Sequence, residues 1–116
     1  MIKFCGLRKR KKEQNLSIRV LTIINPTSGK GNVMEYVEEI KRNLEEQNME
    51  VNIQLTKKEY NAKNIVIDYI EVTDLILVCG GDGTFNETVS ALMELNAKEI
   101  SIAYIPMGTT NDLAKS

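Results

Sequence analysis

A glycine-rich turn between an apolar run and a helix-like segment carries the clearest chemical signal in the sequence. Gly80, Gly81 and Gly83 have no side chains, so the backbone there can bring its N–H groups close to an anion. A helix expected to begin at about Thr84 would add its positive N-terminal end, and the combination predicts a phosphate cradle. Asp82 would repel a bare phosphate, so we expect Mg²⁺ or an acceptor hydroxyl between the two, with Asp82 in a magnesium-linked or proton-transfer role.

The same turn also has a purely structural interpretation. A Gly-Gly-Asp-Gly sequence can be a tight connection in which Asp82 only forms the turn. Thr84 with Glu87 matches a capping box, which would serve only the start of the helix. Neither GxGxxG nor GxxxxGK followed by Ser or Thr occurs in the sequence, so ordinary dinucleotide-fold and P-loop mechanisms are not supported.

Two more polar loops follow apolar runs, at residues 25–31 and 106–112. Their polar and glycine positions are Asn25, Thr27, Ser28, Gly29, Lys30 and Gly31 in the first loop, and Gly108, Thr109, Asn111 and Asp112 in the second. Each loop alone is compatible with an ordinary turn, and Asp112 with a helix cap. Because ligands of parallel sheets bind beyond the carboxyl ends of the strands, such loops gathered on one edge predict a binding site.

These loops interrupt a regular alternation of strand and helix signals. Apolar runs at 19–24, 51–55, 75–79 and 101–105 predict strands. Between them apolar residues recur at helical spacing. They are Val33, Val37, Ile40 and Leu44, then Ala62, Ile65, Val66, Tyr69 and Ile70, then Phe85, Val89, Leu92 and Met93. The alternation predicts a three-layer α/β/α sandwich with a mainly parallel sheet, and the strand order 2-1-3-4 would make the polar loops neighbours.

Three motifs together resemble the diacylglycerol kinase catalytic domain, which is related to the sphingosine kinases. They are NPTSGKG at 25–31, GGDGTFNE at 80–87 and PMGTTNDLA at 106–114. GGDGT is shared with NAD kinases and resembles a motif of phosphofructokinases. NPTSG and GTTND favour the diacylglycerol and sphingosine kinase branch.

The resemblance implies that ATP and Mg²⁺ bind along these loops and that Asp82 lies at the phosphate-transfer centre. The implied reaction is in-line transfer of the γ-phosphoryl group to a hydroxyl of diacylglycerol or a related lipid at the membrane surface. The residues implied to line the ATP pocket are Asn25, Pro26, Thr27, Ser28, Gly29, Thr56, Gly80, Gly81, Asp82, Gly83, Thr84, Phe85, Asn86 and Thr109. Thr56 stands where the family often has a Thr after its second strand, but Tyr60-Asn61-Ala62 stands where a Gly is common.

Family members resemble two-domain enzymes whose C-terminal β-rich domain supplies the lipid-binding surface. We therefore expect residues 18–116 to be an ATP-binding domain truncated at its C-terminus and inactive alone, without the second domain. An apolar surface left where that domain would pack predicts a homo-oligomer. Two alternatives stay open, a NAD kinase-like enzyme using the same turn and a nonenzymatic nucleotide-binding remnant.

The charge is unevenly distributed along the 116 residues. Six of the fifteen basic residues lie between Lys3 and Lys12, so residues 1–17 are expected to be a disordered basic tail or a contact for anionic lipid headgroups. The remainder, from Glu13 on, has a net charge of −7, which argues against a nucleic-acid partner.

Cys5 and Cys79 lack CxxC spacing and the chain has no His, which argues against zinc. Without a signal peptide pattern, we expect a cytoplasmic protein that is soluble or peripheral at the membrane.

Overall fold

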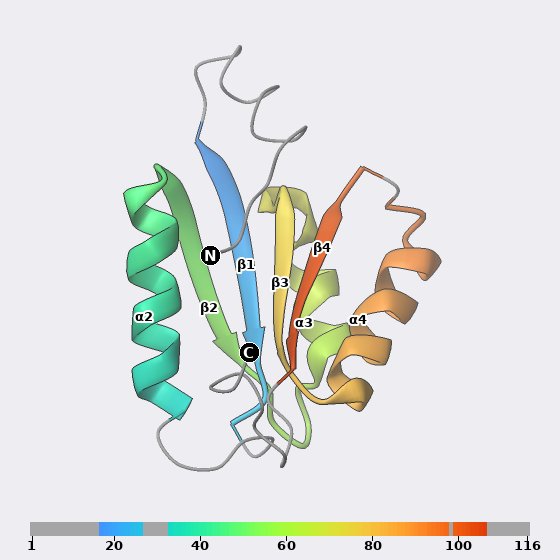
Figure 1. The fold of residues 1–116 in the computed structure, drawn as a ribbon. Coiled ribbons are helices and arrows are strands. Elements are labelled where there is room, and N and C mark those ends of the chain that lie inside the picture. The colour runs from blue at the N-terminus through green and yellow to red at the C-terminus, as the bar shows by residue number, and fades with distance from the viewer. Residues whose placement is uncertain (1–16, 27–32, 98, 107–116) are drawn as a thin grey trace.

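The computed structural model describes residues 17–26, 33–97 and 99–106 of the chain. Within these residues four parallel strands form one sheet with the order β2-β1-β3-β4 (Figure 1). The strands are β1 (Ile18–Ile24), β2 (Met49–Leu55), β3 (Leu75–Gly80) and β4 (Ser101–Pro106). The helices are α2 (Val33–Glu46), α3 (Ala62–Tyr69) and α4 (Asp82–Glu94), with a 3₁₀ turn at Ile70–Val72. The predicted α/β architecture and strand order are both confirmed.

Helices cover both faces of the sheet, with α2 on one face and α3 and α4 on the other (Figure 1). Alternate residues of the central strands therefore enter two separate cores. The core under α2 contains Ile18, Val20, Ile24, Val37, Ile40, Leu44, Met49, Leu75, Leu77 and Cys79. The core under α3 and α4 contains Leu21, Ile23, Ala62, Ile65, Val66, Ile76, Val78 and Ala91. Burial on both faces explains why β3 is an unbroken apolar run.

The packing face of α4 agrees only in part with the predicted one, since Phe85 and Leu92 pack against the core and Met93 does not. Its buried residues are Thr84, Thr88 and Ala91, whereas Met93 is 75% exposed and the prediction that it faces the core was wrong. The helix begins at Asp82, two residues before the expected start, because Gly81 takes the extended N-cap backbone. The buried Thr88 hydroxyl donates a hydrogen bond to the Thr84 carbonyl at 2.9 Å, so its burial leaves no unpaired donor.

Asparagines end two helices and begin a third. Asn48 after α2 and Asn96 after α4 have φ of 66° and 55°, in the left-handed region that closes helices and that Asn tolerates better than most residues. Asn61 caps α3, where its side chain accepts from the Asn64 N–H and the Asn64 side chain accepts from the Asn61 N–H. Asparagine thus closes α2 and α4 and caps the start of α3.

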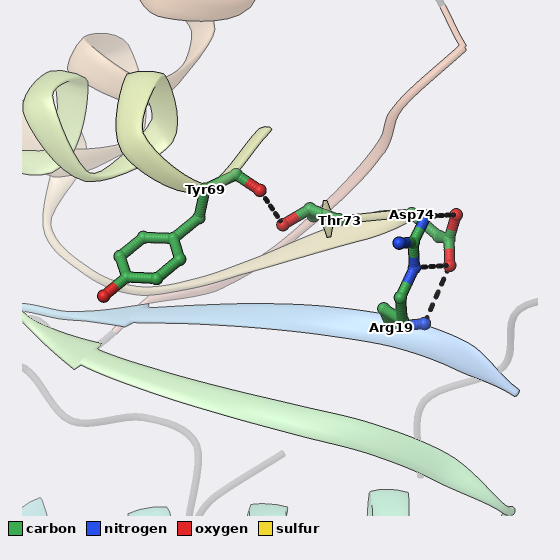
Figure 2. Close-up of polar contacts among 4 residues, drawn as sticks. All are labelled: Arg19, Tyr69, Thr73 and Asp74. Atoms are coloured by element: carbon green, nitrogen blue, oxygen red, sulfur yellow. Dashed lines mark hydrogen bonds and ion pairs between the residues drawn. The ribbon is translucent and has the colours of Figure 1, made fainter. Parts of the chain in front are cut away.

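The amino edge of the sheet, where the strands begin, is held by a bidentate ion pair (Figure 2). The Asp74 carboxylate accepts from the Arg19 backbone N–H at 2.9 Å and from its guanidinium Nε and Nη2 at 3.0 and 3.2 Å. The Asp74 N–H donates in return to the Arg19 carbonyl at 2.8 Å. Next to this pair, the Thr73 hydroxyl donates to the Tyr69 carbonyl at 2.7 Å (Figure 2). These contacts fix β3 beside β1 at the amino edge.

Candidate active site

An open cleft of about 470 Å³ lies at the carboxyl edge of the sheet, where the strands end. Its lining residues are Asn25, Thr56, Lys57, Lys58, Asn61, Gly83, Thr84 and Glu87. They come from the segments that follow β1, β2 and β3, so the fold joins residues far apart in the sequence. Four of the predicted site residues, Asn25, Thr56, Gly83 and Thr84, meet in this cleft.

Asn25 connects the end of β1 to the start of α4. Its backbone N–H donates to the Cys79 carbonyl at 3.0 Å, and its side-chain Nδ2 donates to the Thr84 hydroxyl at 3.3 Å. Gly80 makes this approach possible, because a Cβ atom at Gly80 would lie 3.2 Å from Thr84 Oγ1 and 3.3 Å from Asn25 Cβ. The glycine at the end of β3 therefore leaves room for the close packing of Asn25 and Thr84 at the floor of the cleft.

The N-terminus of α4 opens at the same place. Gly81 is the N-cap and supplies no side chain to the first N–H groups of the helix, and the helical bonding begins with the Phe85 N–H to the Gly81 carbonyl at 3.2 Å. The N–H groups of the first turn therefore point out of the helix end together with its partial positive charge. A Cβ at Gly83 would have no atom within 4 Å, so a ligand can approach the backbone closely. This arrangement suits an anion.

Thr84 and Glu87 do not form the predicted capping box. Thr84 lies inside the helix and is 5% exposed, with its hydroxyl accepting the hydrogen bond from Asn25. Glu87 accepts from the Ala62 N–H at 3.3 Å, at the first residue of α3. The capping interpretation was wrong because α4 starts two residues earlier than the pattern suggested. Glu87 instead joins the start of α3 to the side of α4 along the cleft.

Asp82, the predicted catalytic residue, lies on the other side of α4. Among the described residues that line the cleft Asp82 is absent, and its Oδ1 accepts a hydrogen bond from the Tyr104 hydroxyl in β4 at 3.1 Å. Phe85, one turn further along, packs on the Tyr104 ring with centroids 4.7 Å apart. Burial and then this hydrogen bond raise the pKa of the Tyr104 phenol. Asp82 itself is exposed at the helix end, where a carboxylate is favoured.

A short turn after β2 brings two positive charges to the cleft. The Thr56 N–H donates to the Ile24 carbonyl at 2.8 Å, which ties the end of β2 to β1. Lys57 and Tyr60 then exchange backbone hydrogen bonds of 2.9 and 3.1 Å and place Lys57 and Lys58 on the cleft wall. Sequence reasoning missed both lysines, although their position directly after Thr56 was a usable signal.

The Tyr60 phenol and the Cys79 thiol both have a raised pKa. The Tyr60 hydroxyl donates to Asp68 at 2.5 Å, and this bond, with smaller contributions from burial and charge, raises the pKa of Tyr60 to about 12. Burial raises the pKa of the Cys79 thiol to about 12, so the thiol stays protonated at neutral pH and is a poor nucleophile.

The remaining predicted site residues are placed only in part. Pro26 and Asn86 are exposed beside Asn25 and Phe85. Thr27, Ser28, Gly29 and Thr109 lie outside the described residues.

Within the described ranges no group of three or more His, Cys, Asp or Glu side chains could hold a metal ion. None of the helices in that part of the chain is long and apolar enough to cross a membrane.

Comparison with known proteins gives a consistent family. The sequence profile described as "Diacylglycerol kinase catalytic domain" matches residues 19–116. Sphingosine kinase 2 of Arabidopsis thaliana is 35% identical over 104 residues, which are 84% of this chain and 22% of that protein. The diacylglycerol kinase of Bacillus subtilis is 32% identical over 99 residues, which are 84% of this chain and 32% of that protein.

Solved structures agree with the sequence matches. A crystal structure of a diacylglycerol kinase from Bacillus anthracis superposes with a TM-score of 0.65 at 30% sequence identity. The match covers 84% of this chain and 35% of that structure. The chain thus spans about a third of the length of the bacterial proteins that it matches.

Proposed function

The chain belongs to the diacylglycerol kinase catalytic domain family, a family of lipid kinases, and on that basis we propose that it binds ATP at the carboxyl edge of its sheet. The proposed reaction is transfer of the γ-phosphoryl group of ATP to the hydroxyl of diacylglycerol or a related lipid. Because the chain spans 32% of the Bacillus subtilis relative, we propose that the lipid acceptor binds to protein outside these 116 residues.

The start of α4 is the observation that carries the proposal. Gly81 and Gly83 leave the first N–H groups of the helix open toward the cleft, and Lys57 and Lys58 stand on its wall. A triphosphate carries several negative charges, and this edge offers it a helix N-terminus together with two ammonium groups. Residues 13–116 have a net charge of −7, so the rest of their surface attracts an anion less well than the cleft with its two lysines does.

Six of the eight residues that line the cleft have a role in this proposal. Asn25 and Thr84, already bonded to each other, present an amide and a hydroxyl to the nucleotide. Gly83 leaves room for a phosphate at the backbone. Lys57 and Lys58 neutralise phosphate charge, and Thr56 supplies a hydroxyl beside them. Phosphoryl transfer depends mainly on such positioning and charge neutralisation, so no buried nucleophile is needed.

We propose that Asp82, one residue before the cleft-lining Gly83, lies at the transfer centre and holds Mg²⁺, although its carboxylate is bonded on the β4 side of α4. Its carboxylate is exposed at the end of α4, with one oxygen bonded to Tyr104. Mg²⁺ in kinases is commonly held by one or two carboxylates together with the substrate phosphates, so a large acidic cluster is not required. Asp82 and the phosphates would hold the ion, which neutralises charge on the phosphates when bound.

We further propose that the enzyme works at the membrane surface on the cytoplasmic side, where a lipid acceptor is reached. The basic residues between Lys3 and Lys12 would contact anionic headgroups there. Self-association stays a prediction. Large apolar side chains exposed in the described part of the chain are Leu55, Ile67, Val72, Met93 and Leu95, and light scattering of the purified chain tests whether they associate.

Nucleotide binding by the chain provides the first test. ATP is titrated in the presence of Mg²⁺ against the wild type and against a Lys57→Gln/Lys58→Gln variant. We expect the variant to bind about tenfold more weakly, since two cations near a phosphate each contribute on the order of 0.5–1 kcal/mol. The Lys41→Gln/Arg42→Gln variant on α2 loses the same charge away from the cleft and should bind as the wild type does.

Transfer of label from ATP provides the second test. The wild type and Asp82→Ala are incubated with labelled ATP, Mg²⁺, diacylglycerol vesicles and NAD. Lipid labelling that Asp82→Ala abolishes would support the complete proposal, and ATP binding without labelling would support the nucleotide-binding part alone. Labelling of NAD would overturn the lipid assignment, and a chain that does not bind ATP would overturn the proposal.

A further inference from the structure

Tyr104 in β4 was not among the predicted site residues, yet its side chain contacts two of them. Its hydroxyl donates to Asp82 Oδ1 at 3.1 Å, and its ring packs on Phe85 with centroids 4.7 Å apart and an interplanar angle of 33°. These contacts join β4 to the first turn of α4, at the residue proposed for the transfer centre.

The geometry of the helix explains why one side chain reaches both partners. Asp82 and Phe85 are three residues apart in α4, so they lie on the same face of its first turn. Tyr104 is paired with Val78 of the neighbouring strand and is part of the sheet beneath that face. The Phe85 ring limits the tilt of the Tyr104 ring, and the fixed ring limits where the hydroxyl can lie.

The bond from Tyr104 is the contact that orients Asp82 within the described part of the chain. Asp82 is exposed at the end of the helix, and Gly81 and Gly83 on either side provide no side chains against which it could pack. The hydrogen bond from Tyr104 to Oδ1 favours one orientation of the Asp82 carboxylate, and in this bond Oδ2 takes no part. A catalytic group held in one orientation loses less conformational freedom when the substrate arrives.

We propose that Tyr104 is a positioning residue that orients the Asp82 carboxylate for Mg²⁺-bound ATP. The proposal rests on the proposed function, because it assigns Asp82 to the nucleotide site. It goes beyond the motifs, since Tyr104 lies before the PMGTTNDLA segment and outside GGDGTFNE. Tyr104 acts through Asp82 and Phe85 and need not touch the nucleotide.

A double-mutant cycle tests the proposal. Tyr104→Phe keeps the ring on Phe85 and removes only the hydroxyl, Asp82→Asn removes the carboxylate charge, and the third variant combines them. ATP affinity is measured for each with excess Mg²⁺ and again with the metal chelated. We expect Tyr104→Phe to weaken binding with Mg²⁺ about fivefold, the size of one hydrogen bond, and to change binding without the metal little. In the Asp82→Asn background the same change should have no further effect.

The controls separate this role from ordinary packing and from failure of the proposed function. Tyr69→Phe, at the amino edge, is the matched substitution and should leave both affinities unchanged. Equal effects of Tyr104→Phe in both Asp82 backgrounds, or no effect on a wild type that binds ATP, would overturn the positioning role and leave ATP binding intact. A wild-type chain that binds no ATP would overturn both. The unfolding midpoints of the four cycle proteins without nucleotide give an independent measure, and additive midpoints would contradict a Tyr104–Asp82 bond.

Discussion

The two edges of the sheet use their polar side chains in opposite ways. At the amino edge the Asp74 carboxylate accepts three hydrogen bonds from Arg19, between 2.9 and 3.2 Å, and the Thr73 hydroxyl is bonded to a backbone carbonyl (Figure 2). At the carboxyl edge Asn25 and Thr84 share a bond of 3.3 Å, and Lys57 and Lys58 extend along an open cleft. Polar groups at the amino edge are paired with one another, whereas the described part of the carboxyl edge combines paired side chains with two lysines on the wall of an open cleft.

This difference has a physical reason. A side chain whose polar atoms are already paired gains little by binding a ligand, since each new bond replaces an old one. A loosely bonded polar group contributes less to folding and can bind at small cost, so binding sites are often the less stable parts of a fold. We therefore expect variants of the amino edge to change stability, and variants of the carboxyl edge to change nucleotide affinity.

The largest effect should come from Asp74→Ala. The substitution leaves the Arg19 backbone N–H without its carboxylate acceptor and removes the bidentate contact with the guanidinium. The side chain of Asp74 is 12% exposed and that of Arg19 39%, so solvent screens part of the pair. We expect a loss of about 2 kcal/mol in the free energy of unfolding, measured with urea.

Affinity for ATP should change little in Asp74→Ala, measured where the variant is still folded. Glu71→Ala, three residues earlier and exposed, provides the control for removing one acidic side chain. A loss of ATP affinity as large as the loss of stability would break the comparison, because it would show that the two edges are coupled.

Gly80→Ala should have the next largest effect and should lower both the free energy of unfolding and the affinity for ATP. The new Cβ would lie 3.2–3.3 Å from Thr84 and Asn25, so these side chains must move by a few tenths of an ångström. We expect a loss of about 1 kcal/mol in the free energy of unfolding and a loss of ATP affinity of about tenfold. Urea unfolding and nucleotide titration measure the two, and an unchanged affinity would show that the Asn25–Thr84 contact is not part of the site.

The sequence predicted the sheet well because its signals are local. The runs at 19–24 and 75–79 are apolar whichever residues surround them, and their alternation with helical segments fixes the topology. The edge of the sheet at which the cleft lies followed from that topology. Such features depend on the residue types alone and not on the positions of single side chains.

The side chains of the site were predicted less well because their partners lie in other elements. Met93 lies about 100° around the helix from Leu92, at the margin of the predicted stripe, and is exposed. Asp82, which was expected in the turn before the helix, lies in the first turn of α4 and is bonded to Tyr104 of β4. Tyr104 and Lys57 lie far from GGDGT in the sequence and meet α4 only through the fold. The position of Lys57 next to Thr56 was a usable signal, whereas no local pattern in the sequence reports the contact between Tyr104 and Asp82.

Gly83→Ala should change the free energy of unfolding and the affinity for ATP in opposite directions. A Cβ at Gly83 meets no atom within 4 Å, and alanine favours the helix over glycine. We expect the free energy of unfolding to rise by about 0.5–1 kcal/mol, while ATP affinity falls about fivefold because the methyl group occupies the approach to the backbone. Thermal unfolding and nucleotide titration are the measurements. A variant that is more stable and binds normally would place the phosphates away from Gly83.

The smallest effect concerns the turn that carries Lys57 and Lys58. The hydrogen bond from Tyr60 to Asp68 is the main reason that the pKa of Tyr60 is raised from 10.0 to about 12. Because the folded pKa lies above the unfolded one, the contact stabilises the fold below about pH 10, and this contribution is lost as the pH rises through about 12.

Asp68→Asn should therefore lower the pKa of Tyr60 toward 10.0, which a spectrophotometric titration compared with Tyr60→Phe would detect. Since Tyr60 is exposed to water in this contact, the stability at neutral pH should change little, and ATP affinity should fall less than in Lys57→Gln/Lys58→Gln. That ranking follows from the same principle as the other variants: the Tyr60–Asp68 contact is exposed, and the charges of Lys57 and Lys58 matter more to the ligand than to the fold. A large loss of stability at neutral pH in Asp68→Asn would contradict it.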